Sequence, residues 1–159
     1  MYRTITIAAA ALLGACATAE TSAPDADAVL AALGGAQVRA CPADRVQEGA
    51  FVSGEAETLG VTSSDLGIIL LSGEPSHRLR LRRLVLAPGA TIQWHVHDSV
   101  EGMALLLSGE LVERRNSCRD PIVYRAGDIS PETHGVAHSW RNESGAEATV
   151  LVAHRIPAS

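Results

Sequence analysis

Two histidines one residue apart, His95 and His97, are the side chains of this sequence best placed for metal chemistry. They lie at the end of an apolar run, residues 91–96, that is typical of a β-strand. Alternate side chains of a strand point to the same face, so both imidazoles would project together while Trp94 and Val96 point the other way. Two neighbouring imidazoles can chelate a metal ion, although an isolated histidine pair is more often structural.

Two further residues could complete such a site. Glu101 follows His97 within a short loop, and His138 lies in a later segment, residues 136–140, that an antiparallel strand could bring across. Three imidazoles and one carboxylate suit a divalent first-row transition metal (iron, manganese, nickel, copper or zinc) and leave positions for water, O2 or substrate. Magnesium and calcium fit poorly because they prefer all-oxygen sites.

Short apolar runs separated by turn signals must position these residues. The runs are 66–71, 79–86, 91–96, 103–107, 122–124 and 148–153, and the turns are Ser72-Gly73, Pro88-Gly89, Ser108-Gly109, Gly127-Asp128 and Ser144-Gly145. Strands at this spacing without intervening helices predict an all-β sandwich or barrel. Before them, residues 28–40 could form one short helix that ends at Gly34-Gly35. With one Phe and two Trp, the core is expected to be aliphatic.

Composition and charge exclude several function classes. All 13 basic residues are arginine, so mechanisms that need a lysine, such as a Schiff base or a P-loop, are excluded. A net charge of −5 argues against nucleic acid as a partner, because such binding needs a clustered basic face. The alternation of Arg78, Arg80 and Arg82 with leucines predicts a solvated strand face.

The spacing around the histidines resembles the two sequence motifs of the cupin superfamily. The first motif comprises Gly89, His95, His97 and Glu101, and the second comprises Gly127, Thr133, Gly135, His138 and Asn142. The resemblance covers roughly residues 78–154. It implies a double-stranded β-helix, the cupin jelly-roll barrel, with a metal held inside by His95, His97, Glu101 and His138. By analogy with the family, it also allows a homodimer.

The sequence departs from that pattern at two points. In the family, the glutamate precedes the closing glycine of the first motif by seven positions, but Glu101 precedes Gly109 by eight. Either a bulge absorbs the extra residue or Glu101 misses the metal. Thr133 replaces the usual proline, and its neighbours Glu132 and His134 are reserve candidates for a ligand, a supporting partner or a proton-transfer group.

The first residues read as an export signal. A short positive start and a brief apolar run precede Leu13-Gly14-Ala15-Cys16, which resembles the bacterial lipobox. We expect residues 1–15 to be a signal peptide and Cys16 to carry the lipid that anchors the chain at the cell envelope. The alternative is cleavage at the A-x-A site of residues 17–19, which would release a soluble periplasmic protein. If Cys16 carries the lipid, residues 16–40 are expected to be a lipidated N-terminus and tether, before a single barrel domain at 41–159.

Export changes how the remaining cysteines are interpreted. Cys41 and Cys118 form an even pair in a compartment that permits disulfides, so a bridge between them is plausible, with two buried thiols as the alternative. Neither lies in a C-x-x-C arrangement.

Two function classes stay open. The first is a metal-dependent enzyme acting on a small molecule. The resemblance to single-domain cupins makes an oxygenase of phenolic or enolic compounds the leading reaction, with Glu101, Glu132 or His134 accepting the substrate proton. The second is a non-catalytic lipoprotein that binds a metal or a small ligand at the cell envelope. Redox-neutral isomerisation or decarboxylation on the same metal is a minor third possibility.

Overall fold

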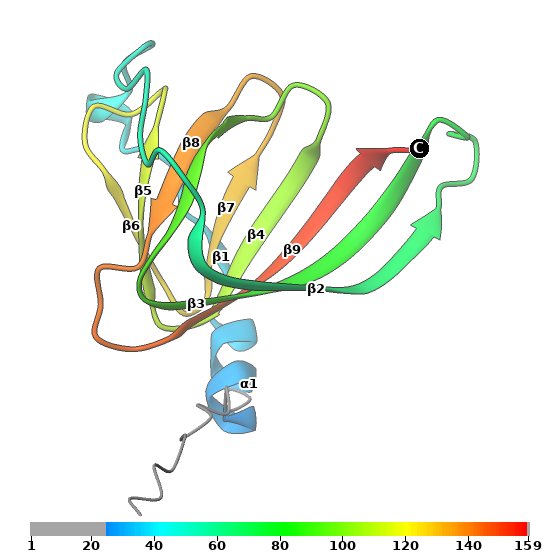
Figure 1. The fold of residues 1–159 in the computed structure, drawn as a ribbon, viewed down its shortest axis with the longest axis horizontal. Helices are drawn as coiled ribbons and strands as arrows, with labels where there is room; N and C mark the ends of the chain where they lie inside the picture. The colour runs from blue at the N-terminus through cyan, green and yellow to red at the C-terminus, as the bar shows by residue number, and fades with distance from the viewer. Residues whose placement is uncertain (1–24, 159) are drawn as a thin grey trace, which may run out of the picture.

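The computed structural model describes residues 25–158, and within them nine strands form one strongly curled sheet (Figure 1). The strand order is β1-β7-β4-β9-β3-β8-β5-β6, and β2 pairs with β3. The strands are β1 (Gln37–Val38), β2 (Leu59–Leu70), β3 (His77–Val96), β4 (Glu101–Ser108), β5 (Glu110–Arg115), β6 (Ile122–Arg125), β7 (Asp128–Glu132), β8 (Ala137–Arg141) and β9 (Ala148–Pro157). The all-β fold class predicted from the sequence is confirmed.

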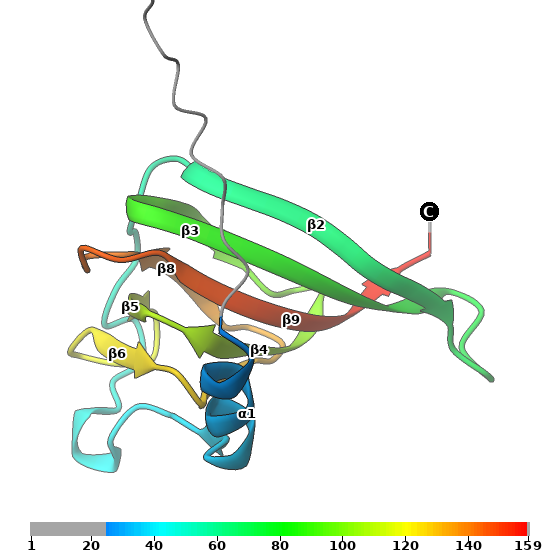
Figure 2. The ribbon, with the colours of Figure 1, turned by 90° about the horizontal axis from the view of Figure 1, so that it is seen from below.

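The helix predicted near the N-terminus is present and short. Helix α1 (Ala26–Gly34) begins after Asp25, whose carboxylate accepts the Asp27 N–H, and it contacts β4 at one end of the sheet (Figure 2). Strand β1 then pairs with β7, and a single 3-10 turn, η1 (Ala43–Arg45), follows. Within residues 25–158 no helix has the length and apolarity needed to cross a membrane.

Strand β3 curls the sheet because its two halves pair with different strands. Its first half lies between β2 and β9, and its second half pairs with β8 from Thr91 to Val96. The turn predicted at Pro88-Gly89 is wrong: both residues lie inside β3 as a bend, where Gly89 has a φ of +77°. Asn142 fixes this bend, because its side-chain amide donates to the carbonyls of Leu86 and Ala87 at 3.0 and 3.1 Å.

Side chains of β3 alternate between the two faces of the sheet, but the arginines and leucines occupy the opposite faces from those predicted. Arg80 and Arg82 line the interior, whereas Leu79 and Leu81 are exposed. The solvated arginine face is therefore wrong for these two residues. The register explains it, because Arg80 and Arg82 pair with His154 and Val152 of β9, whose side chains also line the interior.

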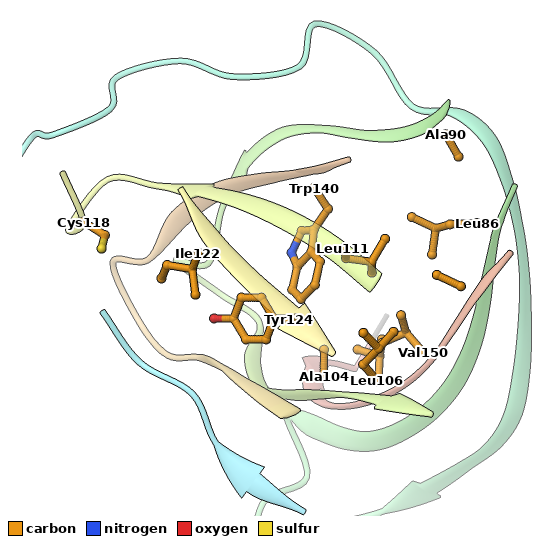
Figure 3. Packing of buried hydrophobic residues seen from close by; sticks show 12 residues of the cluster. Leu86, Ala90, Ala104, Leu106, Leu111, Cys118, Ile122, Tyr124, Trp140 and Val150 are labelled. Atoms are coloured by element: carbon orange, nitrogen blue, oxygen red, sulfur yellow. The ribbon is translucent and has the colours of Figure 1, made fainter. Parts of the chain in front are cut away.

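The core fills the closed end of the curl (Figure 3). Its buried members are mostly aliphatic, as expected, and the rings of Tyr124 and Trp140 pack at a centroid distance of 4.9 Å. The buried cluster comprises Leu86, Ala90, Ala104, Leu106, Leu111, Cys118, Ile122, Tyr124, Trp140, Ala148, Val150 and Val152. This packed end holds β8, and with it His138, rigidly against β3 and β5.

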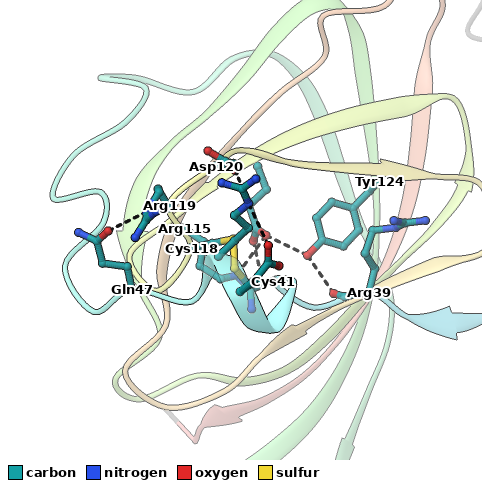
Figure 4. Close-up of a disulfide and its surroundings, with 11 residues drawn as sticks. Arg39, Cys41, Gln47, Arg115, Cys118, Arg119, Asp120 and Tyr124 are labelled. Atoms are coloured by element: carbon teal, nitrogen blue, oxygen red, sulfur yellow. Dashed lines mark hydrogen bonds and ion pairs between the residues drawn. A yellow bond between two sulfur atoms is a disulfide. The ribbon is translucent and has the colours of Figure 1, made fainter.

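The predicted disulfide is confirmed (Figure 4). Cys41 and Cys118 are joined by a 2.03 Å bond across 77 residues of sequence. The bridge attaches the segment before β2 to the loop between β5 and β6. Around it, Arg119 Nε donates to Gln47 Oε1 at 3.1 Å and Arg45 pairs with Asp120 at 3.4 Å.

Candidate metal centre

Three imidazoles converge inside the sheet, as the sequence predicts. His95 and His97 come from β3 and the residue after it, and His138 comes from β8, where it lies directly opposite His95 in the register. The Nε2 atom of His138 is 2.9 Å from Nε2 of His97 and 3.2 Å from Nε2 of His95. His138 is fully buried and His97 nearly so. The three rings therefore offer one small, enclosed group of nitrogen donors.

The hydrogen-bond partner of Nδ1 in each ring indicates whether the Nε2 atom of that ring carries a proton. Nδ1 of His95 lies 2.9 Å from the Gln93 carbonyl, and Nδ1 of His97 lies 3.0 Å from the Val100 carbonyl. Nδ1 of His138 faces a carboxylate oxygen of Glu113. Since all three partners are acceptors, each Nδ1 carries the proton, and each Nε2 of a neutral ring presents a lone pair. Three lone pairs that converge at these distances repel one another, and a cation bound between them would relieve that repulsion.

The carboxylate behind His138 belongs to a buried ionic cluster. Arg115 donates to both oxygens of Glu113, at 2.9 and 3.1 Å, and Tyr124 Oη donates to Glu113 at 2.9 Å. Burial raises the pKa of the Glu113 carboxyl, but His138 and Arg115 lower it by more, so it is ionised. The indole Nε1 of Trp140 also lies 3.1 Å from His138 Nδ1, but the ionised carboxylate is the stronger partner.

A carboxylate and a fourth imidazole border the three histidines. Glu132 of β7 and His154 of β9 are both buried, and together with His97 they form a second group of donor atoms within 4.8 Å of one another. Glu132 Oε1 lies 3.8 Å from His138 Nε2, and its other oxygen is hydrogen-bonded to His154 Nε2. Glu132 is thus one of the two reserve residues suggested by the sequence, and the structure brings it to the cluster.

Glu101 lies elsewhere, at the start of β4. Its Oε1 accepts the backbone N–H of His134 at 3.0 Å, and it belongs to neither group of donor atoms. The ring of His134 is exposed, with Nδ1 against the Asp98 carbonyl at 3.0 Å. The structure therefore brings together His95, His97, His138 and Glu132, and it leaves Glu101 and His134 at the rim.

The register of β4 explains the position of Glu101. The next residue, Gly102, pairs with Glu132 on one side and with His154 on the other, so it occupies the inward position. Strand β4 does contain a register shift, between Leu106 and Ser108, yet Glu101 remains at the rim. Glu132 and His154 occupy the inward face on both sides of the glycine.

Burial favours the neutral form of His95 and His97. It lowers the pKa of His95, and it lowers the pKa of His97 to about 4; in both cases neighbouring His138 adds to the effect. Burial alone would raise the pKa of Glu132, but the hydrogen bond from His154 and the charge of His138 bring it below the usual value. Neutral imidazoles beside an ionised carboxylate are the protonation states that a divalent cation requires.

A cavity of about 300 Å³ opens beside the donor atoms. Its polar wall contains His95, His97, Glu132 and His154. Its apolar wall comes from β3, β4, β5 and β9 and from the residue before β4, and it includes Leu84, Ile92, Val100, Ala104, Leu111, Val150 and Val152. Such a cavity can hold a small organic molecule next to the cluster and keep bulk water away from it.

Sequence reasoning missed three residues of this region, namely Glu113, His154 and Arg80. His154 follows Val150 and Val152 at the alternate spacing of a strand, which could have placed it on the inward face. Glu113 likewise alternates with Leu111 in a segment taken only as the stretch between motifs. Nothing in the local sequence of Arg80 indicates that arginine rather than leucine points inward.

Comparison with known protein families finds a similarity in the central and C-terminal parts of the chain. A family model described as "Cupin domain" matches residues 82–154, which contain every histidine and carboxylate of the two donor groups. No curated protein matches the chain.

Solved structures of low sequence identity resemble it over part of its length. The Cnp3 cupin domain of Schizosaccharomyces pombe is 14% identical, with 60% of this chain and 64% of that chain covered and a TM-score of 0.49. The Cupin_2 domain of an XRE family transcriptional regulator from Enterobacter cloacae is 16% identical, with 63% and 99% covered and a TM-score of 0.49. A predicted oxalate decarboxylase from Thermotoga maritima is 19% identical, with 65% and 98% covered and a TM-score of 0.43.

Proposed function

We propose that residues 82–154, which match the cupin model, form a cupin domain whose interior holds a divalent first-row transition metal. His95, His97 and His138 would bind it through Nε2, and Glu132 would supply the carboxylate. The observation that carries the proposal is the convergence of three Nε2 atoms, since that of His138 lies 2.9 Å from that of His97 and 3.2 Å from that of His95. Iron, manganese, nickel, copper and zinc all accept this donor set.

The choice of Glu132 over Glu101 has a direct test. Glu132→Gln removes the buried carboxylate while keeping its shape, and Glu101→Gln does the same at the rim. We expect Glu132→Gln to weaken metal retention by at least about tenfold and Glu101→Gln to leave it nearly unchanged, measured by elemental analysis after dialysis against a chelator. Greater loss in Glu101→Gln would assign the ligand to Glu101. Equal retention in both variants would indicate a site of three histidines alone.

We propose further that the domain is a metal-dependent enzyme of the oxygenase class acting on a small phenolic or enolic molecule. When bound, a redox-active metal would supply O2 activation and would attract an enolate or phenolate oxygen. The apolar wall of the cavity would hold the substrate body and exclude water. His154 Nε2–H donates to Glu132 and keeps that carboxylate oriented toward His138.

Metal identity and oxygen consumption test this activity. The chain is produced in an oxidising compartment, its metal is identified by elemental analysis, and O2 uptake is followed with a panel of phenolic and enolic compounds. Bound iron with substrate-dependent uptake supports the oxygenase. Tightly held zinc with no turnover on any compound overturns it and supports the second function class, a non-catalytic metal or small-ligand binding protein.

We also propose that the protein acts at the bacterial cell envelope, anchored through lipid on Cys16. The Cys41–Cys118 disulfide supports an oxidising compartment, because such bridges are rare where thiols are kept reduced. Cys16 itself lies outside the described residues. Labelling with a radioactive fatty acid should mark the wild type and not Cys16→Ser. A soluble periplasmic protein that begins within residues 17–20 would contradict the anchor and favour the A-x-A cleavage site.

A further inference from the structure

Two arginines of β3 line the cavity beside the metal cluster. In the register of β3 with β9, Arg80 lies opposite His154, and Arg82 lies opposite Val152. Both arginines border the same cavity as His95, His97 and Glu132. Charged side chains rarely occupy the inward face of a strand. Here two arginines do so, while Leu79 and Leu81 of the same strand are exposed. The arrangement calls for a partner inside the cavity.

The positive charge of this pair is only half compensated. Asp65 of β2 pairs with Arg82, whose Nε donates to its Oδ1 at 2.6 Å, while Arg80 Nε lies 3.9 Å from the same oxygen. One carboxylate therefore faces two guanidinium groups and leaves one positive charge. Burial lowers the pKa of Arg80, and the charge of Arg82 lowers it further against the opposing effect of Asp65.

One hydrogen-bond donor of Arg80, its Nε, is also unsatisfied. Its Nη2 approaches His154 Nδ1 at 3.5 Å, which is a long contact. Its Nε is buried and has no hydrogen-bond partner among residues 25–158. A buried donor without an acceptor is costly, and a guanidinium matches the planar geometry of a carboxylate.

We propose that the cavity binds a small organic monocarboxylate, with its carboxylate on Arg80 and its apolar body against Leu84 and Val152. The proposal rests on the metal function above and adds the class of substrate. A single uncompensated positive charge matches a monoanion better than a phosphate dianion. The cavity of about 300 Å³ is at the small end of ligand sites, so it fits a compact molecule.

His154 connects the two ends of the cavity. Because its Nδ1 faces the Arg80 guanidinium, its Nε2 carries the proton and donates to Glu132. A carboxylate bound to Arg80 would therefore lie next to the residue that orients Glu132. The ring of His154 is also 5.5 Å from that of His97, and Arg80 and His97 line the same cavity, so the bound molecule would share that cavity with the histidine cluster.

Binding of matched acids and amides tests the proposal. The full chain, with the metal it carries when isolated, is titrated with acetate, butyrate and benzoate, with their neutral amides, and with inorganic phosphate. Calorimetry measures affinity, and the fluorescence of Trp140, which lines the cavity, reports the site. We expect at least one acid to bind about tenfold or more tightly than its amide. Phosphate should bind more weakly than that acid.

Substitutions assign the effect to Arg80. Arg80→Gln should weaken binding of the acid about tenfold or more and leave binding of the amide unchanged, because only the charged contact is lost. Arg83→Gln is the matched control, since Arg83 lies on the same strand but is exposed. Arg80→Lys keeps the positive charge but removes the paired N–H donors of the guanidinium, so the affinity for the acid should fall several-fold. If Arg80→Gln does not fold, judged by circular dichroism, the comparison of Arg80→Lys with Arg83→Gln decides.

Several results would overturn the carboxylate site. These are absence of saturable acid binding at millimolar concentration, equal affinity for acid and amide, tighter binding of phosphate, or equal losses in Arg80→Gln and Arg83→Gln. Metal content, measured in parallel, separates this proposal from the metal function. Acid binding that depends on Arg80 in a chain that holds no metal would defeat the metal site and support the carboxylate site. Full metal content without acid binding would support the metal site and defeat the carboxylate site.

Discussion

The chemistry of this protein depends first on which nitrogen of each histidine is free. Backbone carbonyls hold Nδ1 of His95 and His97, whereas the ionised Glu113 holds Nδ1 of His138. A carboxylate that accepts the Nδ1 proton makes Nε2 a stronger metal ligand than a backbone carbonyl does, because the carboxylate stabilises positive charge on the ring. His138 is therefore the ligand whose metal affinity depends most on another side chain.

Removing that carboxylate should weaken the metal site. We expect Glu113→Gln to lower metal affinity by about tenfold to a hundredfold, measured by competition with a chromogenic chelator. Glu110→Gln is the control on the same strand, because Glu110 pairs with Arg125 at the surface at 3.0 Å. Since the change also leaves Arg115 without its counter-ion, the affinity is normalised to the folded fraction. Equal affinities in both variants would contradict the role of Glu113.

The buried state of His97 predicts the pH dependence of stability in the metal-free protein. Burial brings its pKa from 6.5 in the unfolded chain to about 4. Between these values the unfolded state binds more protons than the folded state, so stability falls as pH falls from about 6.5 to about 4. The loss is at most on the order of 3 kcal/mol. Guanidinium unfolding in chelator should show a steeper pH slope in wild type than in His97→Asn, and equal slopes would refute this assignment.

At the level of strands, one glycine decides which strand can supply a carboxylate. A Cβ added at Gly102 would lie 1.9 Å from the Ala153 carbonyl oxygen and 2.9 Å from Cδ2 of His154. No side chain fits there while the β9 backbone at Ala153 keeps its place. Strand β4 therefore contributes nothing to the cluster from its inward position, and β7 supplies Glu132 instead.

A minimal substitution measures this constraint. Gly102→Ala should lower the free energy of unfolding by about 1–3 kcal/mol, since the methyl group overlaps backbone that cannot move without disturbing the pairing of β4 and β9. Gly67→Ala, also in a strand, is the control because nothing lies within 4 Å of its added Cβ. Chemical denaturation of the metal-free proteins gives both values. Equal effects would mean that the paired backbones of β4 and β9 shift to admit the methyl group at little cost.

Much of this arrangement could be predicted from the sequence, because strand alternation is a local property. The spacing of His95 and His97 is enough to place both on one face, and apolar runs located most strands. Register is not local. Which carboxylate reaches the cluster depends on how β4 pairs with β7 and β9, and a shift of one residue exchanges the faces. The inward turn of Arg80 has the same origin.

At the scale of the whole molecule, the segment before β2 is attached to the sheet by backbone hydrogen bonds and by one covalent link. Cys41 is joined to Cys118, which is fully buried in the core, and residues 46 and 118 form an isolated bridge. The loop between β5 and β6 leads directly from Arg115, the partner of Glu113. The disulfide therefore braces the same region that supports His138.

Removing the disulfide should lower the free energy of unfolding but leave the arrangement of the metal ligands nearly unchanged. In the chain-entropy model, a bridge across 77 residues contributes about 4 kcal/mol, because it restricts the unfolded chain. The Cys41→Ser, Cys118→Ser double variant should lose stability of this order in guanidinium unfolding, while Cys16→Ser should match wild type. Metal affinity of the folded fraction should stay within a few-fold of wild type, since none of the proposed ligands contacts the bridge. A large loss of affinity at full folding would show that the bridge positions His138 directly, through Arg115 and Glu113.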